Sequence, residues 1–395
     1  MRRMLMFAAP AVCAGTLLLI GADNKLPAPY STPDTKNAAK VVAQRTNLHV
    51  PQGFEVKEIA SGLGKPRAMF AIPGTTMFLV SDSLPEGKGA VYALDRNGGE
   101  KKSIAQGLDR PYGVLTYKGY LYVAEPRALK RYTFDSKSLS AQSGQDIIKL
   151  PDDFDKGHWT RSIAIDPKVD KLYMEIGSGS NADPDADERR ATVLECGLDG
   201  SNCQIYARGL RNATGIHFRP GTSELWATVQ ERDGLGEDLV PDFFTKIKKG
   251  GFYGWPWAYF GPNEDPRNAG KHPELVKATI VPDINLGAHV AVMDWTFYSG
   301  KQFPEQYRGG AFFAFRGSSN RAKRVGYSIG YLPFGKNGMP SAQKPEDFLT
   351  GFMLSPDSKE VLGRPVGVAQ LQDGSLVVSE DGANKIYRVT YGTPK

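Results

Sequence analysis

Apolar and polar residues alternate in short segments that recur along the chain from about residue 48 onward. Each unit consists of a strand-like segment, a turn rich in Pro, Gly and Asp, and a second strand-like segment, as in PYGVLTYKGYLYVAE from Pro111. Alternation with a period of two indicates half-buried β-strands. No long stretch with helical periodicity competes with it, so this part of the chain is predicted to be all-β.

The spacing of these units predicts their arrangement. The first three intervals between unit starts are 45, 49 and 53 residues, close to the ~40–50-residue repeat of four-stranded propeller blades. Two later intervals of 76 residues each accommodate insertions. A six-bladed β-propeller is therefore predicted as one domain over residues 48–395, with units that begin at Pro66, Pro111, Thr160, Ala213, His289 and Pro365.

The two ends of this domain are both strand-like, FEVKEIA near its start and KIYRVTY near its end. A closed ring of blades leaves no long unpaired sheet edge. We therefore expect the last blade to be completed by a strand from the N-terminal end of the domain.

The N-terminal residues 1–22 combine a basic start, MRRM, with an apolar run from Leu5 to Ala22, which indicates an export signal. The run is also about the ~18 residues at which a membrane span becomes possible, so an uncleaved anchor is the alternative. Residues 23–47 are polar and rich in Pro and Ala, and are predicted to be a linker. Both interpretations place the folded domain outside the cytoplasm, in the periplasm.

Three cysteines are present, of which Cys13 lies in the apolar run. Cys196 and Cys203 flank a Gly/Asp/Ser/Asn turn in LECGLDGSNCQIY. Two short strands joined by that turn would bring the pair together, and an oxidising compartment then favours a disulfide across the hairpin. The sequence holds no C-x-x-C-H segment and hence no site for covalently attached haem.

The net charge of +6 is small for 395 residues, and no run of five or more basic residues occurs. This pattern argues against nucleic-acid binding. It leaves open a basic pocket for an anionic small molecule.

Polar residues gather at the starts of the units, where loops of a propeller converge on one end of the central channel. A single arginine there is most often a structural donor, but several together predict an anionic ligand, because the planar guanidinium suits carboxylates and phosphates. The candidates are His158, Arg161, Arg211, Asn212, His289, Arg316, Arg321 and Arg364.

Residues 231–242, ERDGLGEDLVPD, combine five acidic residues with two glycines. Calcium takes carboxylate and backbone carbonyl oxygens from such loops, although the stretch does not follow the EF-hand pattern. A solvated acidic turn is the simpler alternative. The same alternative is favoured for DPDADE at 183–188.

With these motifs in place, the chain resembles the quinoprotein glucose/sorbosone dehydrogenases, six-bladed propellers that use pyrroloquinoline quinone (PQQ) and calcium. The resemblance runs from about residue 48 to the C-terminus and rests on GHWTR, GLRNATG, ERDGLGEDLVPD, GGFYGWP and GRPVGV, among others. It implies oxidation of a sugar or of a sugar-derived alcohol or aldehyde. It also implies a separate electron acceptor, a cytochrome or the quinone pool, and membrane contact only through the N-terminal segment.

The resemblance also implies roles for individual residues. His158 matches the family's general base, with Arg161 setting its loop. Calcium would be held at the turn that matches Asp233 and Gly234. Relatives place a carboxylate near this histidine where Ser178 stands here, so either something else orients His158 or its basicity is lower. The carboxylates of PQQ would be held by Arg211, Asn212, Arg321, Arg316 and Arg364.

Two other functions stay open, because a fold does not fix a function. One is a calcium-dependent lactonase or other hydrolase, for which Asn212 could serve at a central metal. The other is a non-catalytic binding propeller that has lost PQQ.

Overall fold

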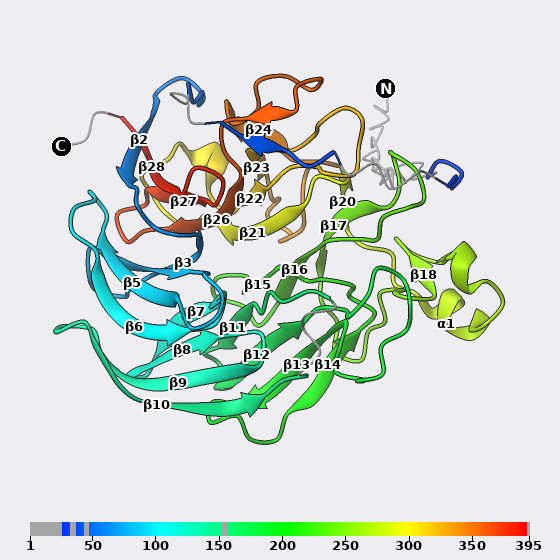
Figure 1. The fold of residues 1–395 in the computed structure, drawn as a ribbon, viewed down its shortest axis with the longest axis horizontal. Helices are drawn as coiled ribbons and strands as arrows, with labels where there is room; N and C mark the ends of the chain where they lie inside the picture. Colours follow the sequence, from blue (N-terminus) through cyan, green and yellow to red (C-terminus); the bar gives the residue numbers. More distant parts are fainter. Residues whose placement is uncertain (1–25, 32–36, 43–46, 152–156, 393–395) are drawn as a thin grey trace, which may run out of the picture.

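The computed structural model describes residues 26–31, 37–42, 47–151 and 157–392. Six four-stranded antiparallel sheets surround a common axis as blades (Figure 1). The predicted six-bladed β-propeller is therefore confirmed. Each predicted unit start lies at the first residue of an innermost strand or up to three residues before it.

The first three blades follow one another along the chain, each running from its innermost to its outermost strand. Their strands are β3 (Pro66–Ala71), β4 (Met77–Asp82), β5 (Gly89–Asp95) and β6 (Lys102–Leu108); β7 (Val114–Tyr117), β8 (Tyr120–Ala124), β9 (Ala128–Asp135) and β10 (Ser140–Lys149); and β11 (Ile163–Asp166), β12 (Lys171–Ile176), β13 (Thr192–Gly197) and β14 (Gln204–Arg208).

The last three blades complete the ring. Their strands are β15 (Gly215–Phe218), β16 (Leu225–Val229), β17 (Pro241–Lys246) and β20 (Ile284–Ala288); β21 (Val292–Phe297), β22 (Ala311–Phe315), β23 (Ser328–Leu332) and β24 (Glu346–Leu349); and β26 (Pro365–Gln370), β27 (Leu376–Glu380), β28 (Lys385–Tyr391) and β2 (Phe54–Ala60).

The ring closes as expected, because β2 from the N-terminal end pairs antiparallel with β28 as the outermost strand of the sixth blade. Phe54, at the start of β2, makes edge-to-face contacts with Phe303, Tyr307 and Phe348 of the fifth blade, with ring centroids 4.8, 5.3 and 5.0 Å away. The closing strand therefore also joins neighbouring blades.

An insertion between β17 and β20 accounts for the first long interval in the sequence repeat. It projects from the side of the fourth blade (Figure 1). It contains β18 (Ala258–Tyr259), β19 (Asn263–Glu264), the short 3-10 helix η2 (Pro266–Asn268) and α1 (Pro273–Ala278). A further 3-10 helix, η3 (Glu305–Tyr307), lies in the fifth blade, and no helix in the described ranges is long and apolar enough to cross a membrane.

The described part of the expected linker lies on the propeller. In it, β1 (Lys40–Val41) pairs with β25 (Glu360–Val361), a strand pair outside the blades. The backbone N–H of Tyr30 donates to the carbonyl of Leu235 over 3.1 Å. The predicted export signal, residues 1–22, lies outside the described residues.

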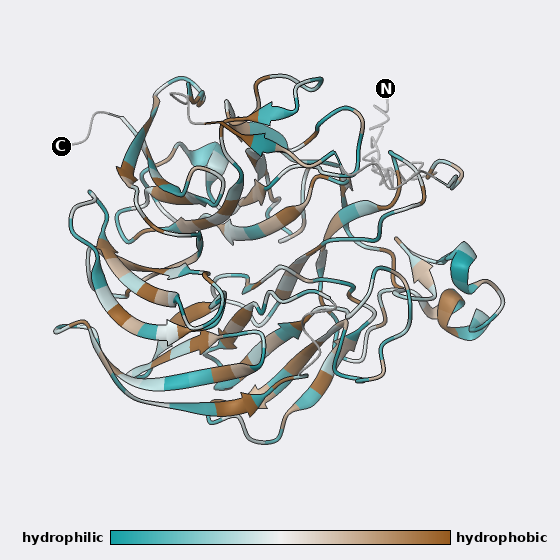
Figure 2. Ribbon diagram, viewed as in Figure 1, coloured by the Kyte–Doolittle hydropathy of each residue, from teal (hydrophilic) through white to brown (hydrophobic). Residues whose placement is uncertain are grey.

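Hydrophobic and hydrophilic residues alternate along many of the strands (Figure 2), and buried apolar side chains of neighbouring blades pack together. Apolar clusters therefore lie between blades, as where Phe54 meets the fifth blade. In the channel itself, Tyr112, Met293 and Val366 lie against one another and against the partly buried Trp159. This apolar centre separates the two ends of the channel.

Candidate functional site

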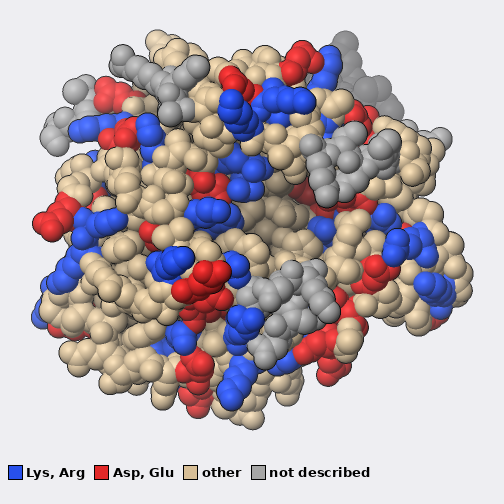
Figure 3. All heavy atoms as spheres, in the orientation of Figure 1, with Lys and Arg blue, Asp and Glu red and all other residues tan. Residues whose placement is uncertain are grey.

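A cavity of about 150 Å³ opens at the end of the channel where the innermost strands begin. Basic and acidic side chains gather around the central hollow of the face seen in Figure 3. The wall comes from loops of the third, fourth and fifth blades. It is formed by His158, Arg211, Gln230, Glu231, Asp233, Asp242, His289, Ala291, Ser319 and Asn320.

His158 lies in the loop before β11, and Ser178, just after β12, orients it. The Nδ1 atom is 3.0 Å from the carbonyl oxygen of Ser178 and 3.1 Å from its Oγ. A carbonyl oxygen only accepts, so Nδ1 carries the proton and a neutral ring presents Nε2 as a base. Burial first, and then the charge of Arg211, lower the pKa of His158 well below its usual range. The missing carboxylate is thus replaced by Ser178 itself.

Arg161 does not line the cavity but supports the loop that carries His158. Its guanidinium is fully buried and donates to the carbonyls of His158 and Thr160 over 2.8 and 2.7 Å. Glu175 of β12 is buried nearby, and burial raises its pKa to about 8 against the opposing charge of Arg161. Glu175 was not predicted as a site residue, because it stands within an ordinary strand pattern.

Arg211 and Asn212 follow the third blade as predicted, but only Arg211 lines the cavity. Its Nε donates to the carbonyl of Asn181 over 3.0 Å, and Nη1 donates to the carbonyl of Glu231 over 2.8 Å. The Nδ2 of Asn212 donates to Gln230 Oε1 over 3.2 Å. Asn181 was not predicted as a site residue, and it is the residue that ties Arg211 in place through both its backbone and its side chain.

Asp233 and His289 form a hydrogen-bonded pair at the cavity. Asp233 Oδ1 lies 3.0 Å from His289 Nδ1, and Nε2 of the ring lies 3.0 Å from the carbonyl of Gly236. Burial opposes the charge of both groups, but these hydrogen bonds outweigh it. They lower the pKa of Asp233 and raise that of His289, so the pair favours carboxylate and imidazolium.

Glu231 and Asp242 are buried carboxyl groups in the same wall. Asp242 Oδ1 accepts from the N–H of Glu231 over 2.9 Å, and Oδ2 accepts from the N–H of Val292 over 3.1 Å. The buried Oε1 of Glu231 has no hydrogen-bond partner among the described residues. Burial raises the pKa of Glu231 to about 8 and that of Asp242 to about 6. A buried, unpartnered carboxylate oxygen at a cavity wall suits a bound cation.

The turn that was predicted to hold calcium consists of Asp233 and Gly234. The carbonyl of Asp233 already accepts from Arg232 Nε and Asn181 Nδ2, each over 3.0 Å. Gly234 is exposed and does not line the cavity. Within the described ranges, no group of three or more His, Cys, Asp or Glu side chains is positioned to hold a metal ion. Side chains alone therefore do not form a complete site there.

The other predicted arginines are engaged elsewhere at the same end of the propeller. Arg316 binds Asp381 through two hydrogen bonds of 3.0 and 3.1 Å, and Arg67 binds the same carboxylate. Arg364 donates to the carbonyl of Gly317 over 3.0 Å. Arg321 forms an ion pair of 2.9 Å with an aspartate of the 231–242 loop. Of the five residues expected to hold the cofactor's carboxylates, only Arg211 lines the cavity.

The acidic run at 183–188 is held by ion pairs and a backbone hydrogen bond. Asp183 lies 2.7 Å from Arg267, and Asp187 lies 2.6 Å from Arg189. Asp185 accepts from the N–H of Gly179 over 2.8 Å. These contacts fix the loop that carries Asn181, and most of the run is exposed, as expected of a solvated loop.

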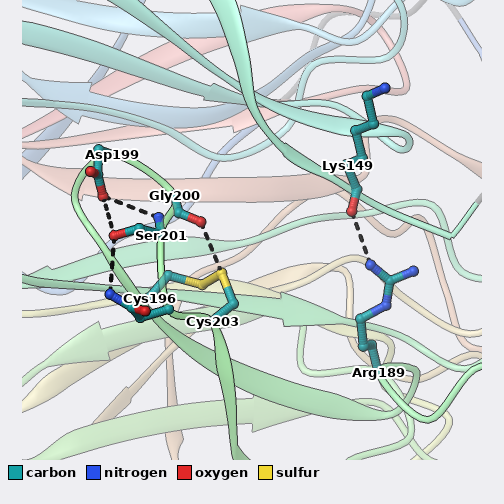
Figure 4. The surroundings of a disulfide bond; sticks show 8 residues. Lys149, Arg189, Cys196, Asp199, Gly200, Ser201 and Cys203 are labelled. Atoms are coloured by element: carbon teal, nitrogen blue, oxygen red, sulfur yellow. Dashed lines mark hydrogen bonds between the residues drawn. A yellow bond between two sulfur atoms is a disulfide. The ribbon is translucent and has the colours of Figure 1, made fainter.

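Cys196 and Cys203 form the predicted disulfide (Figure 4). Cys196 belongs to β13, and Cys203 immediately precedes β14. Between them, Ser201 donates to the carboxylate of Asp199 through both its N–H and its hydroxyl (3.1 and 2.6 Å). The bridge therefore closes the outer hairpin of the third blade.

Comparison with known structures gives the same fold. Over 89% of this chain, it superposes on all of a Trichoderma reesei structure of Carbohydrate-Active Enzymes Family AA12, with a TM-score of 0.75 and 20% identity. The PQQ domain of pyranose dehydrogenase from Coprinopsis cinerea matches with a TM-score of 0.75 and 19% identity, over 89% of this chain and 99% of that domain.

Sequence comparison gives the family. An uncharacterized protein of Borreliella burgdorferi is 31% identical over 362 residues, which cover 88% of this chain and 91% of that protein. The aldose sugar dehydrogenase YliI of Escherichia coli is 30% identical over 110 residues, 27% of each chain. The model of the family described as TrAA12-like matches residues 48–242 and 268–392. The resemblance found in the sequence is thus confirmed, and the chain belongs to the TrAA12-like family.

Proposed function

We propose that this protein is a periplasmic sugar oxidoreductase that uses PQQ and calcium, with His158 as the general base. The names of similar proteins support the class, since one is an aldose sugar dehydrogenase and another the PQQ domain of a pyranose dehydrogenase. The observation that carries the proposal is the hydrogen bond from His158 Nδ1 to the Ser178 carbonyl at the cavity wall.

His158 would remove the hydroxyl proton of the substrate. Its Nε2 holds a lone pair because Nδ1–H is committed to Ser178. The lowered pKa keeps the ring neutral, and thus able to accept a proton, into mildly acidic solution. Arg161 holds the His158 carbonyl and so fixes the loop relative to β11.

The polar residues of the cavity fit an anionic cofactor together with a cation. Arg211 and Asn320 offer donors for carboxylate or carbonyl oxygens, and the unpartnered Oε1 of Glu231 can bind a cation when the carboxyl group is ionised. Arg211 would hold PQQ, and Glu231 would contribute to the calcium site. PQQ supplies an electrophilic quinone that accepts a hydride, and the electrons then leave to a separate carrier.

A titration of the calcium-loaded protein with PQQ tests the proposal, with absorbance for binding and dye reduction for turnover of aldoses, sorbosone and polyols. Stoichiometric binding and turnover are expected in the wild type. His158→Ala should keep PQQ binding and lose at least ~100-fold in turnover. The matched control is His49→Ala, because His49 is exposed and its side chain makes no contact with the cavity.

The pH profile adds a second criterion. Because the pKa of His158 is lowered, kcat/KM should stay constant as the pH falls through 6.5 and decline only below it. No binding at high PQQ concentration would refute the dehydrogenase. Hydrolysis of lactones by the calcium-loaded protein without PQQ would favour the hydrolase alternative.

A further inference from the structure

A second cavity, of about 260 Å³, lies in the channel away from the candidate site. Its wall comes mainly from the innermost strands β3, β7, β11, β15 and β21 themselves, whereas the candidate site is built mainly from loops that precede an innermost strand or follow the second strand of a blade. The apolar centre of the channel separates the two cavities. Met293 contacts Gln230 of the first cavity through its sulfur, while Tyr112 belongs to the wall of the second.

The wall of the second cavity is largely apolar. Phe70, Leu115, Ile165, Phe218 and Phe297 contribute to it. Two of its polar groups are already satisfied by the protein: the hydroxyl of Ser162 accepts from a backbone N–H over 3.1 Å, and that of Tyr112 donates to a carbonyl over 3.2 Å. A sugar would leave most of its hydroxyl groups without partners here, which is costly.

His217 and Asp294 are the exception in this apolar wall. His217 Nε2 lies 2.7 Å from Asp294 Oδ1, which also accepts from the N–H of Trp295 over 2.9 Å. The Asp294 side chain is only 6% exposed. None of the described residues bonds to Asp294 Oδ2 or to His217 Nδ1. With Nε2–H donated to the carboxylate, a neutral ring leaves both of these atoms as acceptors.

Beside a neutral His217 ring, the Asp294 carboxylate has no cationic side chain in the cavity wall, since no lysine or arginine of the described chain lines the second cavity. A buried carboxylate is stabilised by a cation or by donors that satisfy its oxygens. A ligand that fits must therefore bring hydrogen-bond donors and a positive charge, together with an apolar body for the walls.

We propose that the second cavity is a ligand site for a small hydrophobic amine, bound as its ammonium ion. The ammonium group donates to Asp294 Oδ2, and the apolar body packs on the aromatic and aliphatic wall. Carboxylates are repelled by Asp294, and neutral alcohols gain only a hydrogen bond. This site does not depend on the proposed oxidoreductase activity.

Three probes test the site. Benzylamine, benzyl alcohol and benzoate share a phenyl ring and are similar in size, and each is titrated by calorimetry at pH 8. Benzylamine should bind at least 10-fold more tightly than benzyl alcohol, and benzoate should not bind measurably. Trp295 reports locally, because its ring centroid lies 5.2 Å from that of His217. Equal affinity for the three probes, preference for benzoate, or no saturable binding would overturn the proposal.

Variants locate the bound amine. Asp294→Asn should weaken benzylamine binding at least 10-fold and leave benzyl alcohol unchanged. His217→Ala, at a partly exposed side chain, removes the donor that positions the Asp294 carboxylate; it should also weaken benzylamine binding and serves if Asp294→Asn does not fold. Glu231→Gln is the control, because Glu231 lines the other, acidic cavity. Benzylamine binding that is lost in Glu231→Gln but kept in both other variants would place the amine in the first cavity and refute the site.

Discussion

At the scale of single residues, the candidate site holds titratable groups whose charge the protein suppresses. His158 and Glu231 line the same cavity, and burial shifts both toward their neutral forms. A neutral histidine is ready to accept a proton, whereas the neutral glutamic acid must lose its proton before its unpartnered oxygen binds a cation. The two shifts have one cause, the removal of the side chains from water, and they prepare the two groups for different tasks.

Glu231→Gln should change the dependence of stability on pH. The folded pKa of about 8 exceeds the ordinary value of 4.5, so the folded protein binds more protons than the unfolded chain between these values. The free energy of unfolding of the wild type therefore falls as the pH rises through this window. In the variant, position 231 does not titrate and contributes no such fall. In calcium-free buffer at pH 9, Glu231→Gln should be the more stable protein by at least about 1 kcal/mol.

Urea unfolding at pH 4 and pH 9 measures this difference, which should vanish at pH 4. Adding millimolar calcium should stabilise the wild type more than the variant, because the variant lacks the carboxylate. A variant that is less stable than the wild type at pH 9 without calcium would contradict the account.

At the scale of elements, the loops at the blade starts are fixed by contacts with other loops. Asn181 binds Arg211 and also donates to the carbonyl of Asp233, so one side chain joins the loop after β12 to two others. The disulfide also links two segments of the third blade: it joins Cys196 of β13 to Cys203, just before β14, across a separation of seven residues. Asn181 therefore holds the cavity wall, whereas the disulfide fixes the turn between β13 and β14 at the other end of the blade.

Replacing both cysteines, Cys196→Ala with Cys203→Ala, should destabilise the protein by about 2 kcal/mol, since the bridge restricts a short loop in the unfolded chain. Alanine avoids placing a hydroxyl at Cys196, which is fully buried among apolar residues. Urea unfolding with and without dithiothreitol is the measurement. The wild type should lose stability when reduced, and the variant should not respond; a variant that responds to the reductant would contradict the assignment.

At the scale of the whole molecule, stability depends on closing the ring. β2 belongs to the N-terminal end and completes a blade whose other strands come from the C-terminal end. Phe54 of β2 contacts aromatic rings of the neighbouring blade. Closure therefore links sheet pairing with core packing, and it holds the channel and both cavities in shape.

Phe54→Ala should destabilise the protein by about 3–4 kcal/mol, in the range for a large aromatic side chain removed from a core. Glu55→Ala is the control: this neighbouring side chain on β2 is exposed, and its removal should change stability by less than about 0.5 kcal/mol. Thermal and urea unfolding of the two variants compare them. Similar stability of both would show that closure of the ring contributes little.

Much of the fold could be predicted from the sequence, because a blade is specified locally. Period-two alternation and turn residues recur in each unit, so the number of blades, the closing strand and the Cys196–Cys203 pair followed from short segments. His158 and Arg211 were identified in the same way, from their places before and after the strands of the third blade. What the sequence by itself determined was therefore the architecture and the residue types at the mouth of the channel.

Only the tertiary structure decided which of those residues share a cavity. Arg316, Arg321 and Arg364 start or follow strands just as Arg211 does, yet carboxylates or carbonyls from distant segments engage them away from the cavity wall. The orphaned oxygen of Glu231, the orienting carbonyl of Ser178 and the His217–Asp294 pair depend on contacts between separate loops and strands. Such contacts join residues up to 77 positions apart, and no local pattern records them, because burial and partnership are properties of the assembled ring.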